Sequence, residues 1–164
     1  MSIGRFYAGI GALIRARSDG QYLLLQRSAI KDFGAGAWEC VTGRVDQGEG
    51  FEQAAHREVS EELGIEMQID GILGTTHFYR GAPVPENELV GVIFLCSIDS
   101  PVDVKISDEH AQYRWLKGNE ALEMLSPNNP QHAWIRRVIE RAEVMRRFWP
   151  QAAEQYYQEA GFDL

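Results

Sequence analysis

Residues 43–65 read GRVDQGEGFEQAAHREVSEELGI, and this is the most informative stretch of the chain. Its first 22 residues hold six acids and two arginines, so they carry half of the chain's net charge of −8. Helix-forming residues run from Glu49 to Leu63 without proline, and the Gly64 that follows is typical of a helix C-terminus. The stretch therefore predicts an acidic helix that ends at Leu63.

Three glutamates, Glu58, Glu61 and Glu62, lie on one face of this predicted helix, because successive residues turn by about 100°. Their like charges repel and weaken the helix by roughly 0.2–0.5 kcal/mol per exposed pair, so a compensating charge is expected. Carboxylate oxygens are the ligands that Mg²⁺ and Mn²⁺ prefer. Zinc is disfavoured, because no cysteine or histidine shares this face and His56 points away from it. The alternative is a solvated acidic face without a ligand.

The spacing around these glutamates is more specific than the glutamates themselves. Glu49 follows Gly43 after five residues, and after seven more the segment 57–65 reads REVSEELGI. This pattern resembles the Nudix box of the Nudix hydrolase family at every defining position, and the order of the surrounding segments extends the resemblance over residues 5–148. The resemblance implies an α/β protein with the Nudix fold, an α/β/α sandwich with a mixed central β-sheet.

Nudix hydrolases mostly cut the pyrophosphate bond of a nucleoside diphosphate linked to another group, with water and a divalent metal ion. The resemblance therefore implies Mg²⁺ or Mn²⁺ as cofactor, held by three carboxylates and one backbone carbonyl of the box. It also implies an ion pair between Glu49 and Arg57 that orients the glutamates, one of which is a candidate for the catalytic base. The metal ligands that it implies within the box are Gly43, Glu58, Glu61 and Glu62.

The family places a further metal ligand or general base outside the box, on a later loop. Glu109 fits this role, and the segment 109–116 resembles the EHxxYxW stretch of the dihydroneopterin triphosphate/dATP pyrophosphohydrolase branch. Val-Thr-Gly at positions 41–43 stands where many relatives have Pro-Gly-Gly. Both features favour a nucleoside or pterin triphosphate over a sugar-linked dinucleotide, although His110 and Trp115 can equally be core residues.

Cationic and aromatic side chains near the box are candidates for binding the substrate. Arg27, Arg44 and Arg80 flank the box in sequence and are predicted to bind phosphate groups. For Arg80, a solvated surface position is an equal alternative. Phe33 is a candidate for stacking on a base and completes the predicted substrate-binding set.

Three other functions remain compatible with the sequence. One is an ADP-sugar or dinucleotide pyrophosphatase of the same family. A second is an isomerase acting on a prenyl diphosphate, but its arrangement of cysteine and glutamate is not recognisable in this chain. The third is a nucleotide-binding domain without turnover. Such domains usually have an eroded box, whereas this chain keeps every acid.

Composition narrows the class of protein further. The chain has 164 residues, 16 Lys and Arg against 24 Asp and Glu, and 45% apolar residues. This length suits a single domain spanning residues 1–164, with a C-terminal helical segment from about residue 130. No apolar run reaches the roughly 20 residues of a membrane helix, so no membrane partner is expected. The acidic balance disfavours a nucleic-acid polymer as partner.

Cys40 and Cys96 lie in apolar segments and form no CxxC motif, so buried free thiols in the cytoplasm are expected. No signal peptide is recognised at the N-terminus. The predicted partner is a small nucleoside polyphosphate. Because the family often dimerises, a homodimer is a further expectation.

Hydrophobic periodicity predicts the other elements. The expected strands cover 7–17 and 21–26 as a hairpin, 38–42, 65–79 as one or two strands broken near Asp70, 89–98 at the centre of the sheet, and 111–116. The expected helices cover 120–125, a segment with an apolar face from Trp134 to Trp149, and 151–161.

Overall fold

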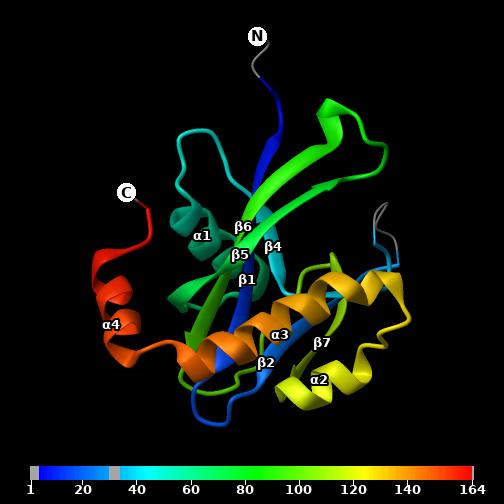
Figure 1. Ribbon diagram of the computed structural model, residues 1–164. Coiled ribbons are helices and arrows are strands. Elements are labelled where there is room, and N and C mark those ends of the chain that lie inside the picture. The colour runs from blue at the N-terminus through cyan, green and yellow to red at the C-terminus, as the bar shows by residue number, and fades with distance from the viewer. Residues whose placement is uncertain (1–3, 30–33, 164) are drawn as a thin grey trace.

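A mixed β-sheet forms the centre of the structure, a computed structural model that describes residues 4–29 and 34–163 (Figure 1). The strands are β1 (Tyr7–Ala16), β2 (Tyr22–Arg27), β3 (Trp38–Glu39), β4 (Val41–Arg44), β5 (Gln68–Tyr79), β6 (Glu88–Ile98) and β7 (His110–Leu116). The helices are α1 (Phe51–Leu63), α2 (Gly118–Met124), α3 (Ala133–Phe148) and α4 (Gln151–Ala160), with short 3₁₀ turns at Pro85–Asn87 and Pro130–His132.

The strands run in the order β3-β2-β1-β6-β5, with β4 also paired to β1 and β7 to β2. Only the β1–β6 pair is parallel among the described strands. Strand β6 lies between β1 and β5, which confirms that the apolar run at 89–98 is interior to the sheet. The mixed sheet expected from the sequence is therefore present.

Apolar side chains that alternate between the two faces of the inner strands form two separate hydrophobic cores. Leu23 and Leu25 of β2 face a core that includes the apolar side of α1, whereas Tyr22 and Leu24 face a core shared with α2 and α3. Successive side chains of a strand point to opposite faces, so both faces of the sheet must be covered. The α/β/α sandwich is thus confirmed, and Figure 1 shows α3 lying across one of these faces.

Helix α1 ends where the sequence predicts and begins two residues later than expected. Gly64 adopts a left-handed conformation with φ of 67°, and its N–H donates to the Ser60 carbonyl. Gly50 lies in extended backbone before the first turn, and its N–H donates to the Gln53 side chain at 3.1 Å. The helix therefore starts at Phe51, after Gly50 rather than at Glu49.

Two strand predictions differ from the structure. The segment 38–42 is divided at Cys40 into β3, which pairs with β2, and β4, which pairs with β1. Within the segment 65–79 only residues 68–79 form a strand, and it is continuous, because shifts of register near Asp70 and Leu73 accommodate the extra residues instead of breaking the pairing with β6. Because of the division at Cys40, Glu39 lies on the strand that pairs with β2, and Gly43 lies on the strand that pairs with β1.

The C-terminal segment packs back onto the beginning of α1. Glu52 Oε2 accepts the backbone N–H groups of Phe162 and Asp163, both at 2.8 Å, and the Glu52 N–H donates to Asp163 Oδ2 at 3.0 Å. The Phe162 ring stacks on Tyr157 of α4 at 4.5 Å between centroids. These contacts tie α4 to the helix that carries the three glutamates.

Other features of the chain agree with the sequence. Cys40 and Cys96 are free and buried, and burial raises the pKa of both thiols above their usual range. No helix within residues 4–29 and 34–163 is both long and apolar enough to span a membrane.

Replacing Glu52 by alanine tests the attachment of the C-terminal segment. The variant loses the acceptor for two backbone N–H groups, so we expect the free energy of unfolding to fall by about 1–2 kcal/mol in urea denaturation. Glu123→Ala, at an exposed position of α2, is the control. Equal stability of the two variants would show that these bonds add nothing.

Candidate active site

Arg57 connects α1 to the loop that precedes it. Its Nε–H and one Nη2–H donate to the two carboxylate oxygens of Glu49, both at 2.9 Å, and Nη2 also donates to the Arg44 carbonyl at 2.8 Å. Its Nη1 donates to Glu58 at 2.9 Å and to Glu61 at 3.3 Å. These bonds lower the pKa of Glu49 and raise that of Arg57, so both groups stay charged.

Glu58 lies directly against the backbone of β4. A Cβ atom on residue 43 would overlap the Glu58 carboxyl group, so only glycine leaves room for this side chain. The Arg44 N–H donates to Glu58 Oε1 at 3.2 Å. The predicted glycine and glutamate of the box are therefore in contact, although they are 15 residues apart.

Glu62 has a buried carboxylate oxygen. Its Oε2 is shielded from solvent and has no hydrogen-bond partner among the described residues. Burial, followed by the charges of Glu58, Glu39 and Glu109, raises the pKa of Glu62 to about 8, and Arg27 acts in the opposite direction. An acceptor left without a donor is costly in a protein interior, so this oxygen is suited to a cation.

Glu61 differs from its two neighbours because its side chain is 62% exposed. Within residues 4–29 and 34–163, no group of three or more His, Cys, Asp or Glu side chains is arranged to hold a metal ion. Glu58 and Glu61 instead share the Nη1 of Arg57. Mg²⁺ usually keeps several waters and uses only one or two carboxylates, so its binding does not require three converged side chains.

The three predicted substrate arginines lie close together, although they come from three separate segments. Burial lowers the pKa of Arg80, and the nearby charges of Arg44 and Arg27 lower it further, whereas Glu109 raises it. The guanidinium of Arg44 also lies over the Tyr7 ring, 4.7 Å from its centroid. The charge of Glu109 thus acts on both Arg80 and Glu62, and its role as metal ligand or base stays a prediction.

A buried ionic network beside these residues was not predicted from the sequence. Glu39 accepts from Arg27 Nη1 at 2.9 and 3.1 Å, and the Nε2 of His110 lies 3.1 Å from its Oε1. The sequence feature that could have revealed it is Glu39, the single acid in the otherwise apolar strand segment 38–41, since buried acids are almost always paired. Phe33, the predicted stacking residue, lies outside the described residues.

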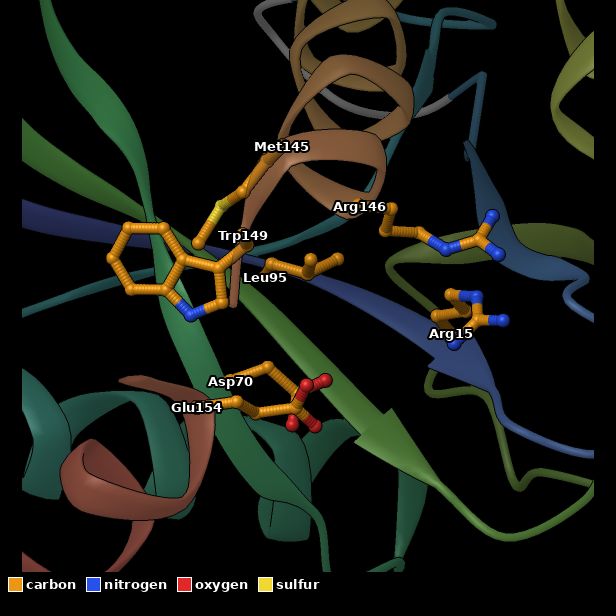
Figure 2. A pocket seen from close by; sticks show the side chains of 7 residues that line it. All are labelled: Arg15, Asp70, Leu95, Met145, Arg146, Trp149 and Glu154. Atoms are coloured by element: carbon orange, nitrogen blue, oxygen red, sulfur yellow. The ribbon is translucent and has the colours of Figure 1, made fainter. Parts of the chain in front are cut away.

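A cavity of about 240 Å³ lies elsewhere, where β1 and β5 meet the end of α3. Figure 2 shows Arg15 and Arg146 on one side of it and the ring of Trp149 on the other. None of the predicted site residues lines this cavity. The candidate active site is therefore the group of residues around Gly43 and Glu58.

Comparison with known proteins decides the family. The NUDIX domain model matches residues 6–141, which include the whole box and Glu109. The chain belongs to the Nudix hydrolase family. It is 32% identical over 108 residues to nucleoside triphosphatase NudI of Escherichia coli O81 (strain ED1a), an alignment that covers 62% of this chain and 76% of that protein.

Two solved Nudix structures are similar over most of their length. The MutT protein of Methanosarcina mazei Go1 has a TM-score of 0.70 and 29% identity, covering 89% of this chain and 99% of its own. The E. coli dihydroneopterin triphosphate pyrophosphohydrolase has a TM-score of 0.61 and 27% identity, covering 83% and 95%. This Nudix chain is therefore an enzyme of the pyrophosphohydrolase class with the family's α/β fold.

A methyl group on residue 43 should separate Glu58 from the backbone of β4. We expect Gly43→Ala to keep its free energy of unfolding within about 2 kcal/mol, because a flexible side chain can move aside. Hydrolytic activity should fall at least about 100-fold, because the carboxylate is displaced. Gly4→Ala, where a Cβ would meet only Phe6 at 3.9 Å, is the control. Full activity of Gly43→Ala would contradict the packing argument.

The pKa of Glu62 predicts how the metal-free protein responds to pH. Because the folded pKa of about 8 exceeds the ordinary value of 4.5, the folded protein holds a proton that the unfolded chain has lost. This contribution to stability is complete below pH 4.5 and is lost as the pH rises through 8.

Urea denaturation in EDTA at several pH values should show a loss of up to about 1.4 kcal/mol per pH unit in this window. Glu62→Gln, which mimics the protonated form, should remove this component. Equal pH slopes for parent and variant would rule out a protonated Glu62.

Proposed function

We propose that this protein hydrolyses a pyrophosphate bond of a nucleoside or pterin triphosphate, with Mg²⁺ or Mn²⁺ bound at the Nudix box. The observation that carries the proposal is the buried Glu62 oxygen without a partner, close to a Glu58 that contacts Gly43. Membership of the Nudix hydrolase family supplies the reaction class.

The donor set fits a hard divalent cation. It contains only oxygen atoms, one of them buried without a donor, and the net negative charge of the glutamates needs compensation. When bound, the cation would neutralise charge on the bridging phosphates and acidify a water for attack on phosphorus. The residues that would hold it are Gly43, through its carbonyl, and Glu58, Glu61, Glu62 and Glu109.

The chain's own residues would divide the remaining work. Arg57, held by Glu49, fixes the position of α1 against the loop and so orients Glu58. In the absence of metal, burial and the neighbouring carboxylates raise the pKa of Glu62 to about 8. Glu62 and Glu109 are the candidate bases, and the one that does not hold the metal would accept the proton of the attacking water.

Arg27, Arg44 and Arg80 would bind the polyphosphate. The positive charges of Arg44 and Arg27 act on Arg80, and an anion bound near these guanidiniums would offset that repulsion. Phe33 is the proposed stacking partner for the base or pterin ring. Two similar proteins act on triphosphates, the NudI nucleoside triphosphatase and the dihydroneopterin triphosphate pyrophosphohydrolase, and their names favour this substrate class.

The proposal also covers the domain organisation, the cellular location and the partners of the protein. Residues 1–164 would act as one Nudix hydrolase domain, because the C-terminal segment from about residue 130 contributes α3 to a core and attaches α4 to α1. Two buried free thiols favour the cytoplasm. The partner would be the small-molecule substrate and not a nucleic-acid polymer or a membrane, and a homodimer stays a prediction from the family.

A panel of nucleoside triphosphates, dihydroneopterin triphosphate, a dinucleotide and an ADP-sugar, with products resolved by chromatography, tests this function. We expect release of pyrophosphate from a triphosphate, dependent on Mg²⁺ or Mn²⁺. Glu58→Gln should lower kcat at least about 100-fold, as is typical for a lost catalytic carboxylate. Glu66→Gln, at an exposed position after α1, is the matched control.

Other outcomes identify the alternatives. Two monophosphates would indicate a dinucleotide pyrophosphatase. Tight nucleotide binding without any hydrolysis would indicate a binding domain. Activity of Glu58→Gln within threefold of the parent would refute the proposed use of the box.

A further inference from the structure

Glu39 joins three strands through one buried carboxylate. Its own strand, β3, has only two residues, and its partners come from β2 and β7. Arg27 Nη1 donates to both of its oxygens, at 2.9 and 3.1 Å, and His110 Nε2 lies 3.1 Å from Oε1. The side chains of Arg27, Glu39 and His110 are only 16%, 11% and 3% exposed. Each of them is therefore held in one orientation.

Stability alone does not explain this network. A buried ion pair loses most of its attraction to desolvation, and apolar residues of similar volume often stabilise a protein equally well or better. Here the network also leaves His110 Nδ1 buried without a hydrogen-bond partner in the part of the chain that the structure describes, which adds a cost. A costly charged group between strands that are otherwise apolar calls for a functional reason.

The location of the network supplies that reason. Thr42, which directly precedes Gly43 of the box, donates from its Oγ1 to Glu39 Oε2 at 3.4 Å. His110 directly follows Glu109 in sequence, and the Glu109 carbonyl accepts the Ser28 N–H at 2.8 Å. The contact to His110 therefore fixes the backbone next to Glu109, while the contact to Arg27 fixes one of the three clustered arginines.

We propose that Glu39 is a positioning residue of the hydrolytic site. It holds Arg27 toward the polyphosphate and, through His110, holds the segment that carries Glu109 against α1. This inference rests on the proposed function, and it assigns a role to a residue outside the Nudix box. Glu39 itself touches neither substrate nor metal in this role, because both of its oxygens are occupied by Arg27 and His110.

Glu39→Gln removes the charge while keeping the shape of the side chain. We expect kcat/KM, and separately the affinity for Mn²⁺ alone measured by electron paramagnetic resonance, to fall 10- to 100-fold, as is typical when a residue that orients metal ligands is lost. The matched control is Glu143→Gln of α3, whose carboxylate contacts Tyr22 at the other end of β2 from Arg27. Glu143 is also a partly buried carboxylate that accepts from an arginine and one further donor, here Arg146 and Tyr22.

A double-mutant cycle separates positioning from a general structural effect. If Glu39 acts through Arg27, the double variant with Arg27→Lys and Glu39→Gln should lose about as much kcat/KM as the more damaging single variant. If the two changes acted independently, through a general loss of stability, their fold-losses in kcat/KM would multiply instead. Values of kcat/KM and Mn²⁺ affinity for Glu39→Gln within threefold of Glu143→Gln would overturn the inference.

His110→Gln provides a second test if Glu39→Gln fails to fold. It leaves the Arg27–Glu39 pair in place, so weaker Mn²⁺ binding by the folded variant supports the inference and unchanged binding refutes it. The failures of the two proposals are distinguishable. A parent protein without hydrolytic activity refutes the proposed function, whereas an active parent with a fully active Glu39→Gln refutes only the role of Glu39.

Discussion

The guanidinium of Arg57 is the contact on which the candidate site depends. It binds Glu49, the Arg44 carbonyl, Glu58 and Glu61 at the same time, so it joins the helix to the loop and strand before it. A planar group with five donors can do this, whereas a lysine ammonium cannot. Without Arg57 the carboxylates of α1 would repel one another with no positively charged side chain in contact with them.

The pairing of the strands determines which groups Arg57 can hold together. Strand β1 pairs with β4 on one edge and runs parallel to β6 on the other, so Gly43 is fixed in the middle of the fold. The absence of a side chain at that position lets Glu58 approach the backbone. The division of the chain at Cys40 sends Glu39 toward β2 instead, where it meets Arg27 and His110. One short segment thus serves both the box and the network beside it.

Charge is distributed unevenly around this centre. Half of the net charge of −8 lies in residues 43–64, whereas arginines from β2, β4 and the segment after β5 gather next to it. An acidic site that is also bordered by guanidiniums suits a polyphosphate with a divalent cation better than a polyanion alone. The cavity near Arg15 and Trp149 has no part in this arrangement.

The sequence by itself determined the acidic helix that ends at Leu63, the box to which it belongs and the family, because helix geometry and motif spacing are local properties. It also determined that the apolar run at 89–98 lies inside the sheet. Only the tertiary structure decided that Glu62 rather than Glu61 is buried, and that Arg80 lies near Arg27. Those outcomes, like the pairing of Glu39, depend on contacts between segments far apart in the chain, which set desolvation and electrostatic distance and leave no periodic signal in the sequence.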